Sequence, residues 1–450
     1  MVDNLHKQKV LELAKRNKVR FIRFWFSDLL GFLKSFAITM DEFENAINEG
    51  MGFDGSSIEG FARIDESDMI AMPDIDTFQI LPWKTADNAV VARVFCDIYN
   101  PDGSAYQGDP RWVLKKNLER MQQMGYDHFY VGPELEYFYF KSANGNSNGQ
   151  PEVLDHGGYF ELTPLDVASD LRKETVLMLE DMGIKVEYTH HEVGPSQHEI
   201  DLRYTDALVM ADYAMTYRLV VKEIALKHGV YATFMPKPLF GQNGSGMHTH
   251  QSLFIGNRNA FFSPTDKYNL SDTARKYIAG LLKHAPEFTV VTNQWVNSYK
   301  RLVPGYEAPV YLSWATKNRS DMIRIPGYKP GKELATRVEL RSPDPACNPY
   351  LAFAVMLSAG LEGIENNYEL APPVERNVYA MTAKERQELG IASLPKDLNE
   401  AIQIARSSAW LKKTLGEHVY EKFLENKEIE WENYRSQVTS YELQRYLPIL

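Results

Sequence analysis

The segment Val131–Phe140, VGPELEYFYF, has the two-residue alternation of a β-strand and carries two acids beside four aromatic residues. In a strand, Glu134 and Glu136 share one face with Phe138 and Phe140, and the opposite face is apolar and aromatic. Taking unpaired carboxylates out of water costs several kcal/mol. The segment therefore predicts a buried strand whose acids meet positive charge.

The composition of the chain is that of a globular protein with more than one domain. Its 450 residues are about three times the usual length of one domain, and 44% of them are hydrophobic. The net charge of -11 argues against a broad surface for nucleic acid, which needs net positive charge. We therefore expect no direct nucleic-acid partner.

The cysteines and the apolar segments indicate a cytoplasmic protein without a membrane anchor. Cys96 and Cys347 are the only cysteines and belong to no CxxC motif, so a disulfide framework and a thiolate metal site are both disfavoured. The first twenty residues are typical of an amphipathic helix and lack the unbroken apolar core of a signal peptide. The longest apolar run, Tyr350–Leu361, is shorter than the roughly 18 residues of a membrane span and predicts a buried helix.

The order of the predicted elements indicates an α+β chain of two domains. A small module of helices and strands fills residues 1–105 and ends at the linker-like segment Tyr99–Pro110, YNPDGSAYQGDP. Residues 106–450 begin with strand-like motifs separated by helical stretches and become mostly helical after Pro349. We expect the larger domain to carry the chemistry.

Acids and histidines recur on the predicted strands of the larger domain. The segment THHEVGPSQHEI, 189–200, places Glu192 and Glu199 around a Gly-Pro turn, and GQNGSGMHTHQSLF, 241–254, puts His248, His250 and Ser252 on one strand face. Isolated strand acids are usually exposed, and a His-x-His pair is often structural. Four such acids with at most two histidines nevertheless favour Mg²⁺ or Mn²⁺ over a closed zinc site.

Positive charge is concentrated near these motifs. Between residues 300 and 341 there are nine Lys and Arg against four Asp and Glu, and RVELRSPD alternates Arg337, Glu339 and Arg341 on one face. Guanidinium groups match phosphate oxygens, although the lysines also fit a solvated loop. Carboxylates, divalent cations and arginines together indicate phosphoryl transfer. No Walker A or strand-linked GxGxxG motif occurs, so nucleotide binding must use another architecture.

Seven motifs in order make the chain similar to class I glutamine synthetases along nearly its whole length. They are FDGSSIEGF (53–61), GPELEYF, HHEVGPSQHEID, NGSGMHTHQSLF, NSYKRLVPGYEAP (297–309), NRSDMIRIP and RVELRSPDPACNPYLAFA. The resemblance implies a small N-terminal β-grasp domain and a large catalytic domain with a curved antiparallel β-sheet flanked by helices. It also implies a homododecamer of two stacked hexameric rings, with active sites between neighbouring subunits.

The same resemblance implies a site for two or three Mg²⁺ or Mn²⁺ ions, with ATP as a substrate. One ion would be held by Glu136, Glu192 and Glu199, and a second by Glu134, His248 and Glu339. The implied nucleotide-binding residues are Glu187, Tyr204, His250, Ser252, Arg319 and Arg337. The implied glutamate-binding residues are Asn243, Gly244, Arg301, Glu307 and Arg341, and Arg324 would face the transferred phosphoryl group.

The family reaction joins ammonia to the γ-carboxylate of glutamate through γ-glutamyl phosphate, giving glutamine, ADP and phosphate. By resemblance, Asp54 would remove the proton of ammonium, and Glu307 would shield the acyl phosphate from water. Tyr379 lies in NVYAMTAKERQELG, without the surroundings of an adenylylated tyrosine. The chain therefore resembles the α-type subclass, in which Arg63 and Glu307 take part in feedback inhibition by glutamine and some members bind nitrogen-responsive transcription factors.

Three other functions compete with glutamine synthesis. A ligase similar to γ-glutamylpolyamine synthetase would use the same metal and phosphate site with a larger amine. The intact DGSS motif and the flap motif PGYEAP around Glu307 favour ammonia. A non-catalytic homologue is disfavoured because all six metal positions are present. A hydrolase with a His-x-His metal site would leave the arginines unexplained.

Overall fold

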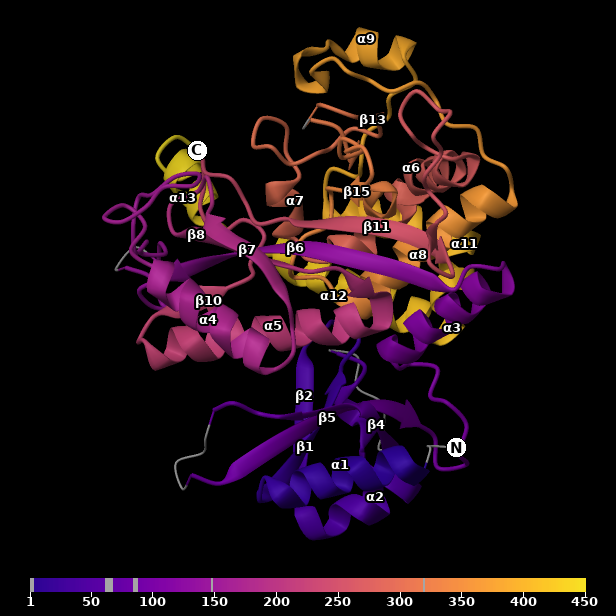
Figure 1. Cartoon of the computed structure of the whole chain (residues 1–450). Helices are drawn as coiled ribbons and strands as arrows, with labels where there is room; N and C mark the ends of the chain where they lie inside the picture. The colour runs from indigo at the N-terminus through magenta and orange to yellow at the C-terminus, as the bar shows by residue number, and fades with distance from the viewer. Residues whose placement is uncertain (1–3, 61–67, 84–87, 147–148, 319) are drawn as a thin grey trace.

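The computed structural model describes residues 4–60, 68–83, 88–146, 149–318 and 320–450, and these residues form two β-sheets with their helices (Figure 1). Two residues of the expected site, Arg63 and Arg319, lie outside the described residues. Within the described ranges, no helix combines the length and apolar character needed to cross a lipid bilayer.

A five-stranded sheet forms the smaller part, at the bottom of Figure 1. Its strand order is β2-β1-β5-β4-β3, and only the β1–β5 pair among them is parallel. The elements are α1 (Asn4–Arg16), β1 (Val19–Ser27), β2 (Leu33–Thr39), η1 (Met40–Glu42), α2 (Phe43–Glu49), β3 (Met51–Asp54), η2 (Gly55–Ser57), β4 (Asp68–Ile80) and β5 (Val90–Tyr99).

β1 supplies large apolar side chains to both faces of this sheet. Phe24 and Phe26 pack in one core with the buried side of α1, whereas Trp25 belongs to the main core of the larger part. Alternation along the strand therefore attaches the small sheet to the rest of the molecule.

A ten-stranded sheet forms the centre of the larger part and confirms the predicted α+β class. Its main order is β13-β14-β15-β11-β6-β8-β7, with β9 and β10 beside β6 and β12 beside β11. The strands are β6 (His128–Phe140), β7 (Val186–His191), β8 (Gln197–Leu202), β9 (Thr205–Asp206), β10 (Tyr231–Thr233), β11 (Met247–Ile255), β12 (Arg258–Asn259), β13 (Trp314–Ala315), β14 (Ile323–Arg324) and β15 (Val338–Leu340). The sheet was expected to be antiparallel. It is mixed, because β13 and β14 run parallel.

Helices cover one face of this sheet, and the chain is mostly helical after Pro349. The buried helix expected at Tyr350–Leu361 is α8, and every residue of that run is buried. The helices are α3 (Pro110–Gln123), α4 (Ser169–Asp181), α5 (Ala207–Lys227), α6 (Asp272–Thr292), α7 (Ser298–Arg301), η3 (Glu333–Ala335), α8 (Pro349–Glu365), η4 (Val378–Ala380), α9 (Ala383–Glu388), α10 (Leu398–Arg406), α11 (Ala409–Leu415), α12 (Glu417–Arg435) and α13 (Ser440–Tyr446). α5 packs on β6 and on α8, and α6 packs on α8.

A buried ionic network connects the two sheets. The guanidinium of Arg111, at the start of α3, contacts Asp74 of β4 at 2.6 Å, Asp97 of β5 at 2.5 Å and Asp212 of α5 at 3.1 Å. The Tyr350 hydroxyl also donates to Asp212, at 2.6 Å. A buried charge of this kind is tolerated only where several partners compensate it.

Candidate active site

The strand register gathers acids, histidines and an arginine on one face of the large sheet. Residues paired across neighbouring antiparallel strands point to the same face. The cross-strand pairs of this face are Glu134 with His248, Glu136 with Glu199, His250 with Glu339, and Arg324 with Glu339. The opposite face of β6 packs Leu135, Tyr137 and Tyr139 into the core, as the alternation of VGPELEYFYF predicts.

The first group of acids, here called the His248 cluster, consists of Glu134, His248 and Glu339. One ligand atom from each lies within 4.8 Å of the others. His248 Nδ1 lies 3.1 Å from Glu134 Oε2, and the guanidinium of Arg341 lies 3.2 Å from Glu339 Oε1. Arg324 also pairs with Glu339. Positive or proton-donating groups therefore surround both carboxylates.

These partners decide the ionisation of the His248 cluster. Burial opposes the charged form of Glu134, but hydrogen bonds from His248 and His250 hold the pKa of this carboxyl well below its ordinary value. Burial likewise opposes the charge of Glu339, and the nearby His250, His248 and Arg341 lower its pKa overall. Both acids are thus ionised and ready to bind a cation.

The second group, here called the Glu192 cluster, consists of Glu136, Glu192 and Glu199. Its acids have fewer compensating partners. Burial raises the pKa of Glu192 to about 7, with repulsion from Glu307 and Asp201. Burial and repulsion from Glu192 raise the pKa of Glu136 well above its ordinary value, and burial and repulsion from Asp201 do the same for Glu199.

The Glu192 cluster therefore has the chemistry of a binding site for a hard cation. Added positive charge would relieve the mutual repulsion of its buried carboxylates. Oxygen-rich donor sets of this kind suit Mg²⁺ or Mn²⁺. His190 lies between two of the acids, with Nδ1 3.4 Å from Glu192 Oε1 and Nε2 3.6 Å from Glu199 Oε1. One ligand atom each from His190, Glu192 and Glu199 lies within 4.8 Å of the others, and Glu136 lines the same cavity.

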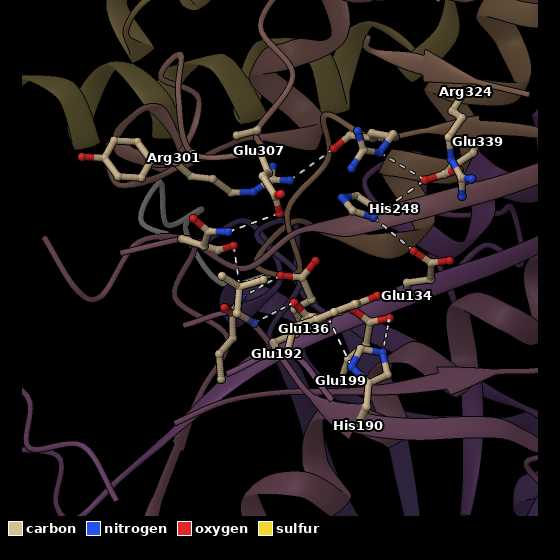
Figure 2. Close-up of a pocket in the computed structure, with 18 of the residues that line it drawn as sticks. Glu134, Glu136, His190, Glu192, Glu199, His248, Arg301, Glu307, Arg324 and Glu339 are labelled. Atoms are coloured by element: carbon tan, nitrogen blue, oxygen red, sulfur yellow. Dashed lines mark hydrogen bonds and ion pairs between the residues drawn. The ribbon is translucent and has the colours of Figure 1, made fainter. Parts of the chain in front are cut away.

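One cavity of about 290 Å³ contains both clusters (Figure 2). Arg324 lies beside the His248 cluster, whereas Arg301 and Glu307 face the Glu192 cluster from the other side. The expected site residues that line this cavity are Glu134, Glu136, Glu192, Glu199, Asn243, Gly244, His248, Arg301, Glu307, Arg324, Glu339 and Arg341. All six expected metal ligands and all five expected glutamate-binding residues are thus brought together.

The residues expected to bind glutamate are held by local hydrogen bonds. The Asn243 amide donates to Glu307 Oε2 at 3.3 Å. The buried Arg301 guanidinium donates to the carbonyls of Ser342 at 2.7 Å and Arg341 at 3.2 Å. Arg301 therefore also fixes the backbone at Arg341, whose side chain reaches Glu339.

A second cavity of about 230 Å³ adjoins the first, because Glu134 and Tyr188 line both. It is lined by the expected nucleotide-binding residues Glu187, Tyr204, His250, Ser252 and Arg337. The Arg337 guanidinium donates to His250 Nδ1 at 3.1 Å, and His250 Nε2 lies 2.7 Å from Glu134. A hydrogen-bonded chain therefore runs from the second cavity to the His248 cluster.

Asp54 is not brought to these cavities within one chain. It ends β3 of the small sheet, is exposed, and accepts a hydrogen bond from the Ser56 amide at 2.9 Å. That backbone hydrogen bond lowers the pKa of Asp54, so the carboxylate is ionised.

Among the lining residues that the sequence analysis did not identify, Gln197 and His190 contact the acids of the site. Gln197 is buried, and its amide donates to Glu136 Oε2 at 2.8 Å and to the Gly244 carbonyl at 3.2 Å. It thereby links a metal-cluster acid to the Asn243–Gly244 loop. Both Gln197 and His190 lie two residues from an acid that was identified, so strand alternation alone could have placed them on the functional face.

Two protein-family models match the chain. The model described as "Glutamine synthetase, beta-Grasp domain" matches residues 18–101, and "Glutamine synthetase, catalytic domain" matches residues 107–446. The glutamine synthetase of Mycolicibacterium smegmatis is 53% identical over 444 residues, which is 98% of this chain and 99% of the relative. That of Methanosarcina mazei is 53% identical over 444 residues, covering 99% and 98%.

Solved structures share the fold over the whole chain. GmaS in complex with ADP superposes with a TM-score of 0.87 at 30% identity and covers 100% of both chains. The glutamine synthetase of Plasmodium falciparum has a TM-score of 0.87 at 26% identity and covers 98% of both. Because two family models span most of its length and relatives are 53% identical to it, the chain belongs to the glutamine synthetase family.

Proposed function

We propose that this protein is a glutamate–ammonia ligase, which forms glutamine, ADP and phosphate from glutamate, ammonia and ATP through γ-glutamyl phosphate. One observation carries the proposal. Two groups of acids that could hold metal ions and three arginines line one cavity, which adjoins a second cavity of about 230 Å³. The high identity to glutamine synthetases supports the same function and does not favour a polyamine ligase.

The two clusters would hold divalent cations, Mg²⁺ or Mn²⁺, with the expected six ligands. When bound, such cations neutralise charge on the phosphates of ATP and on the transferred phosphoryl group. A third ion remains part of the proposal. The raised pKa values of the Glu192 cluster support this assignment, because buried acids that repel one another lack the positive charge that an ion provides.

The remaining residues of the cavities would bind and orient the substrates. In the second cavity, Glu187, Tyr204, His250, Ser252 and Arg337 would hold the nucleotide, with Arg319 as a further family position. Arg301, Asn243, Gly244 and Arg341 would hold glutamate with its γ-carboxylate toward the phosphoryl group. Arg324 and Arg341 would stabilise the negative charge that develops on that group.

Ammonium must lose a proton before it can attack the acyl phosphate, and Asp54 is the proposed base. In one chain Asp54 is exposed on the small sheet, so the proposal requires a second copy to bring it to the cavity. This requirement supports an oligomer, and by family resemblance we propose a homododecamer of two hexameric rings. Glu307 would cover the acyl phosphate and exclude water.

Subclass, regulation and location are also proposals. Tyr379 has its hydroxyl hydrogen-bonded to the Ala308 carbonyl at 2.6 Å, which supports an α-type enzyme that is not adenylylated. Feedback inhibition would use Arg63 and Glu307, so Arg63→Ala should lose sensitivity to glutamine. A nitrogen-responsive transcription factor is a proposed partner, and the ATP requirement supports a cytoplasmic location. We place the boundary between the β-grasp and catalytic domains at residues 105 and 106.

A direct assay tests the function. The full chain is supplied with ATP, glutamate and Mg²⁺ or Mn²⁺, together with ammonium, methylamine or putrescine in separate reactions. We expect glutamine with ammonium and at least about ten-fold less product with either amine, since a larger amine needs a remodelled entrance. Faster reaction with putrescine would contradict the proposal.

A further inference from the structure

Glu307 lies on a short loop whose backbone is strained. The flap, defined here as residues 303–308, contains Gly305 with φ +99° and Glu307 with φ +58°. A positive φ at a glutamate is uncommon and persists only where surrounding contacts hold it. The position of Glu307 over the cavity therefore depends on what fixes the flap at each end.

The substrate side of the flap is held by contacts in and beside the cavity. The Lys237 ammonium lies 3.9 Å from the centre of the Tyr306 ring, and the Asn243 amide donates to Glu307. Asn243 belongs to the proposed glutamate site. These contacts therefore depend on what the cavity holds.

The other end of the flap is held from outside the cavity. The Tyr379 hydroxyl donates to the buried Ala308 carbonyl at 2.6 Å, directly after Glu307. Two backbone hydrogen bonds continue the attachment: the Leu312 amide donates to Ala392, and the Leu394 amide donates to Val310. Residues 378–394 thus form a support for the flap, near α9 at the top of Figure 1.

Tyr379 is itself firmly placed in this support. Its ring packs against Tyr311 with centroids 6.0 Å apart, and the Arg386 guanidinium lies over the Tyr311 ring at 4.4 Å. Burial raises the pKa of Tyr379 to about 12, so its hydroxyl keeps the proton that it donates. Among the hydrogen bonds that join the described residues 303–312 to this support, the one from Tyr379 is made by a side chain.

We propose that Tyr379 is a positioning residue, whose hydroxyl fixes the Ala308 carbonyl and thereby keeps Glu307 over the acyl phosphate. The inference rests on the proposed function. If the flap opens more often, water reaches γ-glutamyl phosphate. The water oxygen then bonds to the acyl carbon, the bond to the phosphate oxygen breaks, and glutamate and phosphate are released without glutamine. ATP is consumed in this side reaction, but no amide is formed.

The test compares Tyr379→Phe with Tyr311→Phe in the full-length enzyme. Tyr379→Phe removes the hydroxyl and keeps the ring, whereas the Tyr311 hydroxyl makes no hydrogen bond to the described flap residues. With saturating ATP, glutamate and ammonium, phosphate and glutamine are measured in the same reaction. We expect a phosphate-to-glutamine ratio near one for the parent and Tyr311→Phe. For Tyr379→Phe we expect about five- to ten-fold slower glutamine formation and a clear excess of phosphate.

Hydrogen exchange gives a second measurement that does not depend on turnover. The amides of residues 303–312 should exchange faster in Tyr379→Phe and as in the parent in Tyr311→Phe. A coupled Tyr379→Phe enzyme with a ratio near one would overturn the inference, whether its turnover is normal or reduced. If the parent protein makes no glutamine, the proposed function is wrong. If the parent makes glutamine and Tyr379→Phe keeps a ratio near one, only the inference about Tyr379 is wrong.

Discussion

The two acid clusters of the cavity lie on neighbouring strands of one sheet, yet their electrostatic states are opposite. In the His248 cluster, histidines and arginines lower the pKa values of Glu134 and Glu339. In the Glu192 cluster, burial and repulsion from neighbouring acids raise the pKa values of all three acids. Protein groups thus compensate the first cluster before any ion binds, whereas the second depends on an added cation.

The largest effect is expected from removing an acid of the His248 cluster. Glu339→Ala should reduce turnover by about three orders of magnitude, because it removes a proposed metal ligand and leaves Arg324 and Arg341 without their carboxylate. Glutamine formation and the size of the assembly by light scattering are the measurements. A Glu339→Ala protein that assembles and keeps near-normal activity would exclude the proposed role of this cluster.

A second pair of variants asks which residue completes the Glu192 cluster. Glu136→Gln should raise the Mg²⁺ or Mn²⁺ concentration for half-maximal activity by roughly 10–100-fold, since it removes a charged ligand. His190→Gln should raise it only a few-fold if His190 supports the acids without binding the ion. Metal titration of activity measures both, and a larger effect from His190→Gln would exchange the two assignments.

Gln197 gives a smaller effect because it acts between the Glu192 cluster and the glutamate loop. In Gln197→Leu the Glu136 carboxylate and the Gly244 carbonyl each lose a hydrogen bond. We expect about a ten-fold loss in kcat/KM for glutamate. The KM for ATP should change little, since Gln197 does not line the second cavity. Equal losses for both substrates would indicate general damage to the fold.

The smallest effect concerns stability without metal, where the clusters should respond with opposite signs. In EDTA at pH 8, Glu199→Gln should raise the melting temperature by about 2–4 °C, because a neutral amide avoids the cost of burying an anion and the repulsion from Asp201. Glu339→Gln should lower it by a similar amount, because Arg324 and Arg341 lose a charged partner. Calorimetry on both variants measures the difference, and shifts of the same sign would remove the distinction between the clusters.

Strand alternation made much of the site predictable from the sequence. It placed Glu134 and Glu136 on the functional face of one strand and the core residues of that strand on the other. The family resemblance then supplied all twelve residues that line the first cavity from the expected set. Charge balance was also anticipated for the His248 cluster, whose buried acids meet arginines and histidines.

Other features leave no signal in a local sequence pattern. The parallel pairing of β13 with β14 joins two short segments eight residues apart, too short for a strong periodic signal. Gln197 has no charge to attract notice, and its function follows from a contact with Glu136, 61 residues away. The bond between Tyr379 and Ala308 likewise joins positions 71 residues apart.

The Arg111 network has a practical consequence for protein engineering. The segment Tyr99–Pro110 has the composition of a linker and looks suited to splitting the chain into two separately expressed fragments. Such a cut would leave Asp74 and Asp97 on one fragment and the Arg111 guanidinium with Asp212 on the other. Each fragment would expose a surface made for a charged counterpart, so the halves should be soluble and folded only when they are co-expressed.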